Sequence, residues 1–199
     1  DAVVFGAATL STDVTINTNA SDTTGDITIG AVTGGSNSLT LSMGNNVANT
    51  DISASGAISG VTTLTLQNVG GTATLSGDVD VTTLTVGNTV ANLVFSGNGS
   101  SVTNAVSFAN DGTLTLQNVG GTATLSGDVD VTTLTVGNTV ANVAFTGNGS
   151  SVANAVSFAN DGTLILGTNG GTQTYNGGLN TASVGGTVTV NGTIATSND

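Results

Sequence analysis

Residues 64–113 read LTLQNVGGTATLSGDVDVTTLTVGNTVANLVFSGNGSSVTNAVSFANDGT, and residues 114–163 repeat this stretch with four substitutions. The substitutions, each conservative in size or polarity, are Leu93/Val143, Val94/Ala144, Ser96/Thr146 and Thr103/Ala153. A third copy starts at Leu164 and soon diverges. A fixed period in this range indicates a solenoid or a repeat array. We therefore expect one solenoid over residues 1–199, with divergent rungs at 1–63 and a decayed third repeat with the C-terminal rungs at 164–199.

Apolar and polar residues alternate strictly within each repeat, which is the pattern of half-buried strands. Thr, Ser or Asp separates apolar residues at a spacing of two, as in Leu64/Leu66, Ala73/Leu75, Val79/Val81, Leu84/Val86 and Val106/Phe108. No window shows a helical period, and Asn-Gly, Asp-Gly and Gly-Gly pairs, which tolerate positive φ, mark corners between strands. A shorter offset of about 20 also aligns Leu64 with Leu84 and Leu75 with Phe95, so rungs of roughly 20–30 residues are expected.

Strands that recur in the same order favour coiling over hairpins. The prediction is an all-β, parallel β-solenoid of about nine rungs, roughly 40 Å long, in which like side chains stack about 4.8 Å apart. An antiparallel sandwich is the competing all-β interpretation.

The 50-residue repeat predicts which side chains share a column. Phe95 should stack with Phe145, and Phe108 with Phe158. Tyr175 takes the place of Leu75 and Leu125, so its hydroxyl is expected to reach a corner or water. Outward threonines should form files at the full period, the most regular being Thr72/Thr74, Thr122/Thr124 and Thr172/Thr174. Such files suggest ice binding, although Thr is also the ordinary outward residue of a parallel sheet.

Composition excludes several classes of function. The chain has 12 Asp, no Glu, no Lys, Arg or His and no Cys, and its net charge is −12. Nothing can neutralise phosphates, so no nucleic-acid partner is expected. The usual ligands of zinc and haem, catalytic triads and Walker-type lysines are also missing, so we expect a non-enzymatic protein without a cofactor. No apolar run approaches the roughly 18 residues of a spanning helix, so no membrane insertion is expected.

The stretch GTLTLQNVGGTATLSGDVDVTTLTVG at residues 112–137 carries the Gly/Asn/Thr-rich alternation of the whole chain. With the missing Cys, it resembles the passenger regions of bacterial autotransporters, most of all the large rickettsial-type outer-membrane surface antigens. The resemblance covers nearly the whole chain and identifies no active residues. It implies a right-handed parallel β-helix at the bacterial cell surface, in adhesion or as a structural layer. The chain begins at Asp1, as a processed product or a piece of a longer chain would.

Four aspartates are the candidate site residues. Asp78 and Asp80, and their copies Asp128 and Asp130, each place two carboxylates about 7 Å apart on one strand face. Oxygen ligands of this kind suit Ca²⁺, and a similar carboxylate pair can act as acid and base on a sugar. A solvated acidic face that prevents edge aggregation is the simpler interpretation.

Both ends of the chain read as plain strands, AVVFGAATL at residues 2–10 and GTVTVNGTIA at 186–195, without a capping helix or edge-guarding Lys or Pro. We therefore expect end-to-end self-association. The predicted function is a non-enzymatic extracellular structural protein that forms a surface filament or fibrous layer. Two alternatives are open. One is the stem or adhesive passenger region of a bacterial surface adhesin, with a host or matrix glycan or protein as partner. The other is a polysaccharide-binding or polysaccharide-cleaving β-helix.

Overall fold

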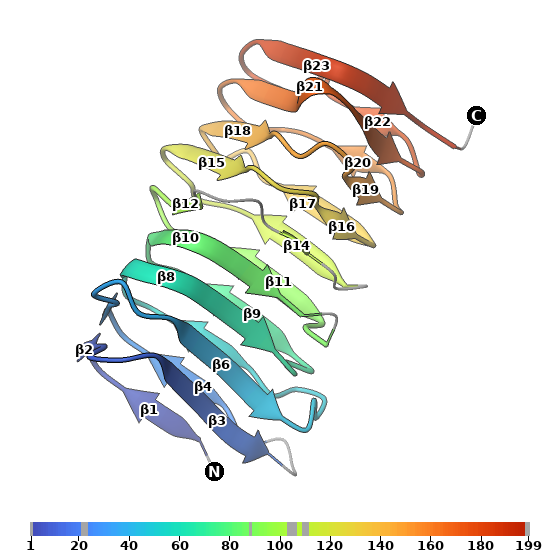
Figure 1. Ribbon diagram of the computed structural model, residues 1–199. Coiled ribbons are helices and arrows are strands. Elements are labelled where there is room, and N and C mark those ends of the chain that lie inside the picture. The colour runs from blue at the N-terminus through green and yellow to red at the C-terminus, as the bar shows by residue number, and fades with distance from the viewer. Residues whose placement is uncertain (1, 21–23, 88, 103–106, 109–111, 198–199) are drawn as a thin grey trace.

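The computed structural model describes residues 2–20, 24–87, 89–102, 107–108 and 112–197, which form 23 strands, β1–β23, and no helix. Every strand pair in this part of the chain is parallel. Figure 1 shows a single stack of strands with the two termini at opposite ends. The predicted all-β, parallel solenoid is confirmed and the sandwich excluded. The coil makes about eight turns from its first rung to its last, which corresponds to the nine rungs expected.

Each turn of the coil contains three strand segments when a long strand that bends between two sides is counted as two segments. Each segment then pairs with the third segment after it. Thr72–Leu75 pairs with Asn92–Phe95, for example, and Asn92–Phe95 pairs in turn with Thr113–Leu116. The solenoid therefore has three sides, which the chain visits in a constant order that we number first, second and third.

The strands are distributed over the three sides as follows. The first side holds β1 (Val3–Phe5), β4 (Ile27–Ile29), β7 (Ile52–Ala54), β9 (Thr72–Leu75), β11 (Asn92–Phe95), β14 (Thr113–Leu116), β17 (Thr133–Val136), β20 (Val156–Ser157) and β22 (Leu179–Asn180). The second side holds β2 (Ala8–Thr9), β5 (Val32–Thr33), β12 (Ser101–Val102), β15 (Thr122–Leu125) and β18 (Asn142–Phe145). The third side holds β3 (Val14–Ala20), β6 (Leu39–Gly44), β13 (Ser107–Phe108), β16 (Asp130–Val131) and β19 (Ser151–Val152). Four long strands bend from the second side to the third: β8 (Ile58–Gln67), β10 (Val79–Val86), β21 (Leu164–Tyr175) and β23 (Val188–Ala195).

The apolar residues of the alternating pattern fill the interior of the coil, because successive strand residues point to opposite faces. Leu64, Leu84 and Leu75 are buried, and Phe95 is only 3% exposed. The shorter offset of about 20 residues gives the true stacking, since Leu64 is the Cα partner of Leu84 and Leu75 that of Phe95.

The 50-residue repeat is out of step with the turn. Residues 114–163 contain seven strands, β14–β20, and a turn contains three, so one repeat makes seven thirds, or 2⅓, turns. Each copy is therefore displaced by one third of a turn from the copy before it. The equivalent residues Leu64, Leu114 and Leu164 lie on the third, first and second sides.

This rotation makes the predicted Phe columns wrong. Phe95 lies on the first side between Leu75 and Leu116. Phe145 lies on the second side between Leu125 and Leu166. Their partners are one turn away, about 21 residues, and not one repeat away.

The second predicted column fails for the same reason. Phe108 pairs with Val86 on the third side, and Phe158 pairs with Val136 on the first. Phe108 and Phe158 therefore belong to different sides of the coil.

The predicted threonine files are also wrong. Thr74, Thr124 and Thr174 lie on the first, second and third sides, respectively. The structure has shorter hydroxyl ladders at the turn offset. Among the described strands, the longest run of paired threonines follows the third side through Thr15, Thr40, Thr65 and Thr85.

Tyr175 does not reach a corner or water. It is 2% exposed, and its hydroxyl donates a hydrogen bond to Gln173 Oε1 at 3.1 Å. Gln173 Nε2 donates in turn to the Phe145 carbonyl at 3.1 Å. Burial raises the pKa of the Tyr175 hydroxyl far above its usual range, so the group stays protonated and remains a donor. The core near the C-terminal end thus contains a buried polar pair.

Candidate functional site

Each candidate aspartate pair begins with a carboxylate that bonds to the next turn. Asp78 Oδ1 accepts the Gly99 amide at 2.8 Å, and Asp128 Oδ1 accepts the Gly149 amide at 2.7 Å. In both copies the partner is the glycine of an Asn-Gly corner 21 residues ahead. These carboxylates satisfy backbone donors where the chain bends and the strand ladder is interrupted.

The structure does not bring the two pairs together. Asp80 pairs with Ser101 on the second side, whereas Asp130 pairs with Ser151 on the third. Within the described ranges, no group of three or more Asp, Glu, His or Cys residues could hold a metal ion. Calcium binding by either pair stays a prediction.

Asp130 is the one candidate carboxylate with a resolved change in acidity. Desolvation by neighbouring atoms raises its pKa, and the nearby Asp128 carboxylate adds a smaller rise. A hydrogen bond from the Ser151 amide acts in the opposite direction. The net rise means that the folded protein holds the Asp130 proton more tightly than an exposed aspartate would.

Sequence reasoning missed three aspartates that perform the same corner role. Asp13 Oδ1 accepts the Ser38 amide at 2.7 Å, and Asp26 Oδ1 accepts the Asp51 amide at 2.8 Å. Asp51 Oδ1 accepts the Thr72 amide at 2.6 Å. A signal was present: each of these residues directly precedes a Val or Ile that opens a strand, as Asp78 does, and Asp128 likewise precedes the buried Val129.

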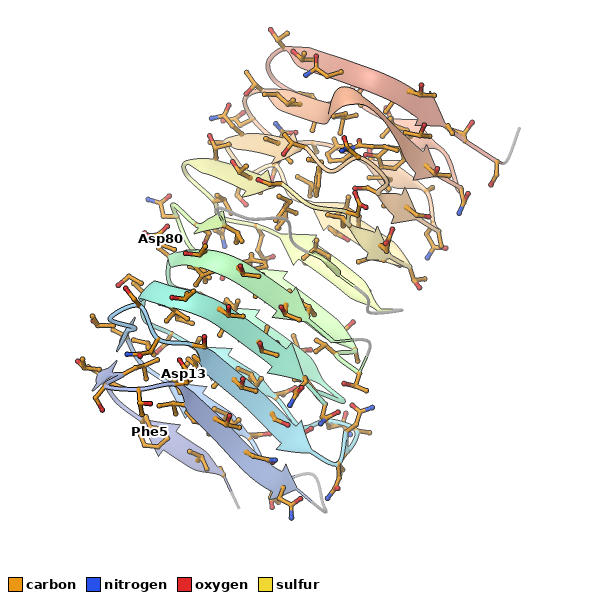
Figure 2. All side chains as sticks on the ribbon, in the orientation of Figure 1. Phe5, Asp13 and Asp80 are labelled. Atoms are coloured by element: carbon orange, nitrogen blue, oxygen red, sulfur yellow. The ribbon has the colours of Figure 1, made fainter. Side chains whose placement is uncertain are left out.

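A shallow groove of about 270 Å³ runs along the corner between the second and third sides. The side chains that line it include Ser36, Thr62, Thr82 and Asp80, the last being labelled in Figure 2. Asp80 is exposed and is the only acid in this lining. Hydroxyls beside one carboxylate can bind a sugar, but the two-carboxylate chemistry of glycoside hydrolysis requires a second acid.

The core is open at the N-terminal end. Phe5, labelled in Figure 2, is the Cα partner of the buried Ile29 but is itself 47% exposed. An opening of about 100 Å³ beside Phe5 is lined by apolar residues, among them Leu10, Val14 and Ile16. In the part of the chain that the structure describes, β1, β2 and β3 each pair with one strand only, so their outer edges are unpaired.

The C-terminal end is open as well. Over the described residues, β23 pairs only with β21. Val190 is the Cα partner of the buried Leu166 but is itself 48% exposed. Unpaired backbone and partly exposed core residues therefore occur at both ends.

The chain matches no family model, and comparisons with curated proteins and with solved structures give no match either. The described residues include no helix long and apolar enough to cross a membrane.

Proposed function

We propose that the chain is a non-enzymatic structural protein, a β-solenoid rod that assembles end to end into an extracellular filament or fibrous layer on a bacterial surface. The observation that carries this proposal is the pair of open ends. Unpaired parallel edges can continue a sheet with another chain, and the half-exposed Phe5 and Val190 gain burial when a further turn covers them.

The rotation of the repeats supports a structural role. A binding face built from repeats presents the same residues on one side, which requires a repeat in step with the turn. Here Leu64 and Leu114 lie on different sides, and the outward residues of each copy rotate with them. The rod consequently has no side on which the repeated residues accumulate.

The composition supports an extracellular location. The sequence contains no Lys or Arg, so it has no cleavage site for trypsin-like proteases, and it contains no Cys that could form unwanted disulfides during export. The resemblance to autotransporter passengers supports the same location. Immunogold labelling of intact source cells tests it: label on the outer surface is expected, and label confined to the interior would contradict it.

Sedimentation velocity and electron microscopy of the purified chain over a range of concentrations test the assembly. We expect rods whose lengths are multiples of about 40 Å and whose number increases with concentration. Phe5→Asp should reduce assembly by placing a charge in the N-terminal opening. Thr135→Asp, on the exposed middle of the first side, is the matched control and should assemble normally. A chain that stays monomeric at every concentration would contradict the filament and favour the stem of a surface adhesin.

One observation favours a second candidate function. The groove beside Asp80 offers hydroxyl and carboxylate groups at one corner, which suits hydrogen bonds to a polysaccharide. A glycan array with and without calcium tests this candidate. Binding that disappears in Asp80→Asn would support it, and the absence of any bound glycan would contradict it.

A further inference from the structure

The strand ladders define how one copy must meet the next. On the second side, consecutive Cα partners trace an unbroken file through every turn: Thr9, Thr33, Ser59, Asp80, Ser101, Thr124, Ala144, Ile165 and Thr189. If a second copy continues the coil beyond Thr189, the next residue in this file is the Thr9 of that copy. We propose that the C-terminal end of one copy docks head to tail on the N-terminal end of a second copy, with β22 on β1 and β23 on β2 and β3. This inference rests on the proposed end-to-end assembly.

The proposed register brings inward residues of the two copies together at the seam, which is the junction between the C-terminal end of one copy and the N-terminal end of the next. With Thr189 beside Thr9 of the next copy, Val188 lies above Ala8 and Val190 above Leu10. Val190 is exposed at its own end, and Leu10 lines the opening beside Phe5. The same stacking continues the internal columns of the coil across the junction, and it covers apolar atoms on both copies.

The distribution of charge favours head-to-tail over head-to-head contact. Asp13 and Asp26 lie in the first two turns, and Asp13 is visible near the N-terminal end in Figure 2. Residues 162–197 contain no charged side chain. A head-to-head contact would place the Asp13 and Asp26 carboxylates of two copies at one junction. In the head-to-tail contact these two carboxylates of one copy lie near residues 162–197 of the other copy, which carry no charged side chain, so fewer carboxylates gather at the junction.

The seam also continues the order of the sides. The last three strand segments along the chain lie on the first, second and third sides, in β22 and the two halves of β23. The first three, β1, β2 and β3, lie on the same sides in the same order. A second copy therefore meets parallel edges on all three sides without any change in the direction of the coil.

Engineered disulfides test this seam, and the chain contains no cysteine of its own. The variant Thr9→Cys/Thr189→Cys changes two exposed outward residues. Neighbouring Cα atoms about 4.8 Å apart lie within the range that a disulfide can bridge. Under mild oxidation we expect a ladder of covalent multimers on non-reducing gels. Thr9→Cys alone and Thr189→Cys alone should give at most dimers. Thr9→Cys/Thr124→Cys, with its second cysteine in the same file at mid-rod, should give no ladder.

The outcomes separate the seam from the proposed function. A ladder only in Thr9→Cys/Thr189→Cys supports the register. Filaments in the microscope without a ladder would overturn the register and leave end-to-end assembly standing. Efficient dimers from Thr9→Cys alone, at the level of the double variant, would overturn the head-to-tail polarity. Neither filaments nor a ladder, with circular dichroism showing a folded chain, would overturn both proposals.

Discussion

Phe145 and Phe158 lie edge to face in the core, with ring centroids 5.9 Å apart and an interplanar angle of 64°. Phe158 also contacts the Tyr175 ring at a centroid distance of 6.4 Å. The three rings come from the second, first and third sides of successive turns, so the cluster ties all three sides together where the decayed third repeat begins.

The cluster predicts a large loss of stability when its central ring is removed. Phe158→Ala should lower the free energy of unfolding by about 3–5 kcal/mol, because it leaves a cavity and removes both ring contacts. Urea denaturation followed by circular dichroism measures the change. Phe5→Ala, at a half-exposed position, should cost much less, and equal losses for the two variants would contradict the proposed role of the cluster.

The buried pair of Tyr175 and Gln173 predicts a dependence between two substitutions. Tyr175→Phe removes the donor to Gln173 Oε1 and should cost about 1–3 kcal/mol, because a buried acceptor loses its partner. In a Gln173→Leu background the same change should cost little. Thermal unfolding of the two single variants and the double variant completes the cycle, and strictly additive costs would contradict the interaction.

Gly97 predicts a steric limit at one corner of the coil. A Cβ at Gly97 would collide with the Gly77 carbonyl in the adjacent turn, whereas a Cβ at Gly6 would meet open space. Gly97→Ala should therefore lower the melting temperature by several degrees, and Gly6→Ala should leave it nearly unchanged. Equal melting temperatures for the two variants would show that the turns can separate at this corner.

Asp130 predicts a pH-dependent effect on stability. Because its pKa is raised in the folded state, the proton stabilises the fold below the ordinary aspartate value of about 3.9. This contribution is lost as the pH rises through the raised value. Asp130→Asn should therefore raise the melting temperature at pH 7 and have little effect near pH 3. A lower melting temperature for this variant at pH 7 would contradict a raised pKa of Asp130 in the folded protein.

The displacement of the repeats predicts that a whole unit can be removed. Deletion of residues 64–113 joins Thr63 to Leu114, whose following sequence is nearly identical to that after Leu64. Every remaining strand keeps equivalent neighbours, so the shortened chain should fold, with a rod shorter by 2⅓ turns, about 11 Å. Circular dichroism and small-angle scattering check both points.

A deletion longer by one residue is the control for this experiment. Removal of residues 64–114 joins Thr63 to Thr115 and exchanges the inward and outward residues of the strand that follows. This variant should lose most of its cooperative unfolding transition. If both deletions behaved alike, the register would not depend on the alternation.

The sequence predicted the inward residues and the parallel coil because these depend on alternation along each strand. The burial of Leu64, Leu75 and Phe95 follows directly from that pattern. The columns depend instead on the length of the turn, and the 50-residue identity masked the weaker offset that sets it. The 50-residue identity therefore predicts Phe145 in the column of Phe95, whereas the offset of about 20 residues predicts the observed pairing of Phe95 with Leu75.

The site residues were predicted less well because their roles depend on contacts between turns. The hydrogen bond from the Gly99 amide to Asp78 requires the exact turn length, which no local motif provides. Tyr175 offered a clearer signal. The third copy replaces an Ala and a Leu two residues apart with Gln173 and Tyr175, and two polar groups introduced together on an inward face are expected to bond to each other.

The mismatch of seven strands per unit with three per turn also bears on how this protein can vary between generations. Gain or loss of one 50-residue repeat in the coding sequence lengthens or shortens the rod. It also rotates the part of the rod that follows the repeat by one third of a turn about the axis of the coil. Since each unit meets nearly identical neighbours, such changes in copy number disturb little of the interior. Length thus becomes an inherited property that can change in discrete steps, and three such steps restore the original orientation of the far end.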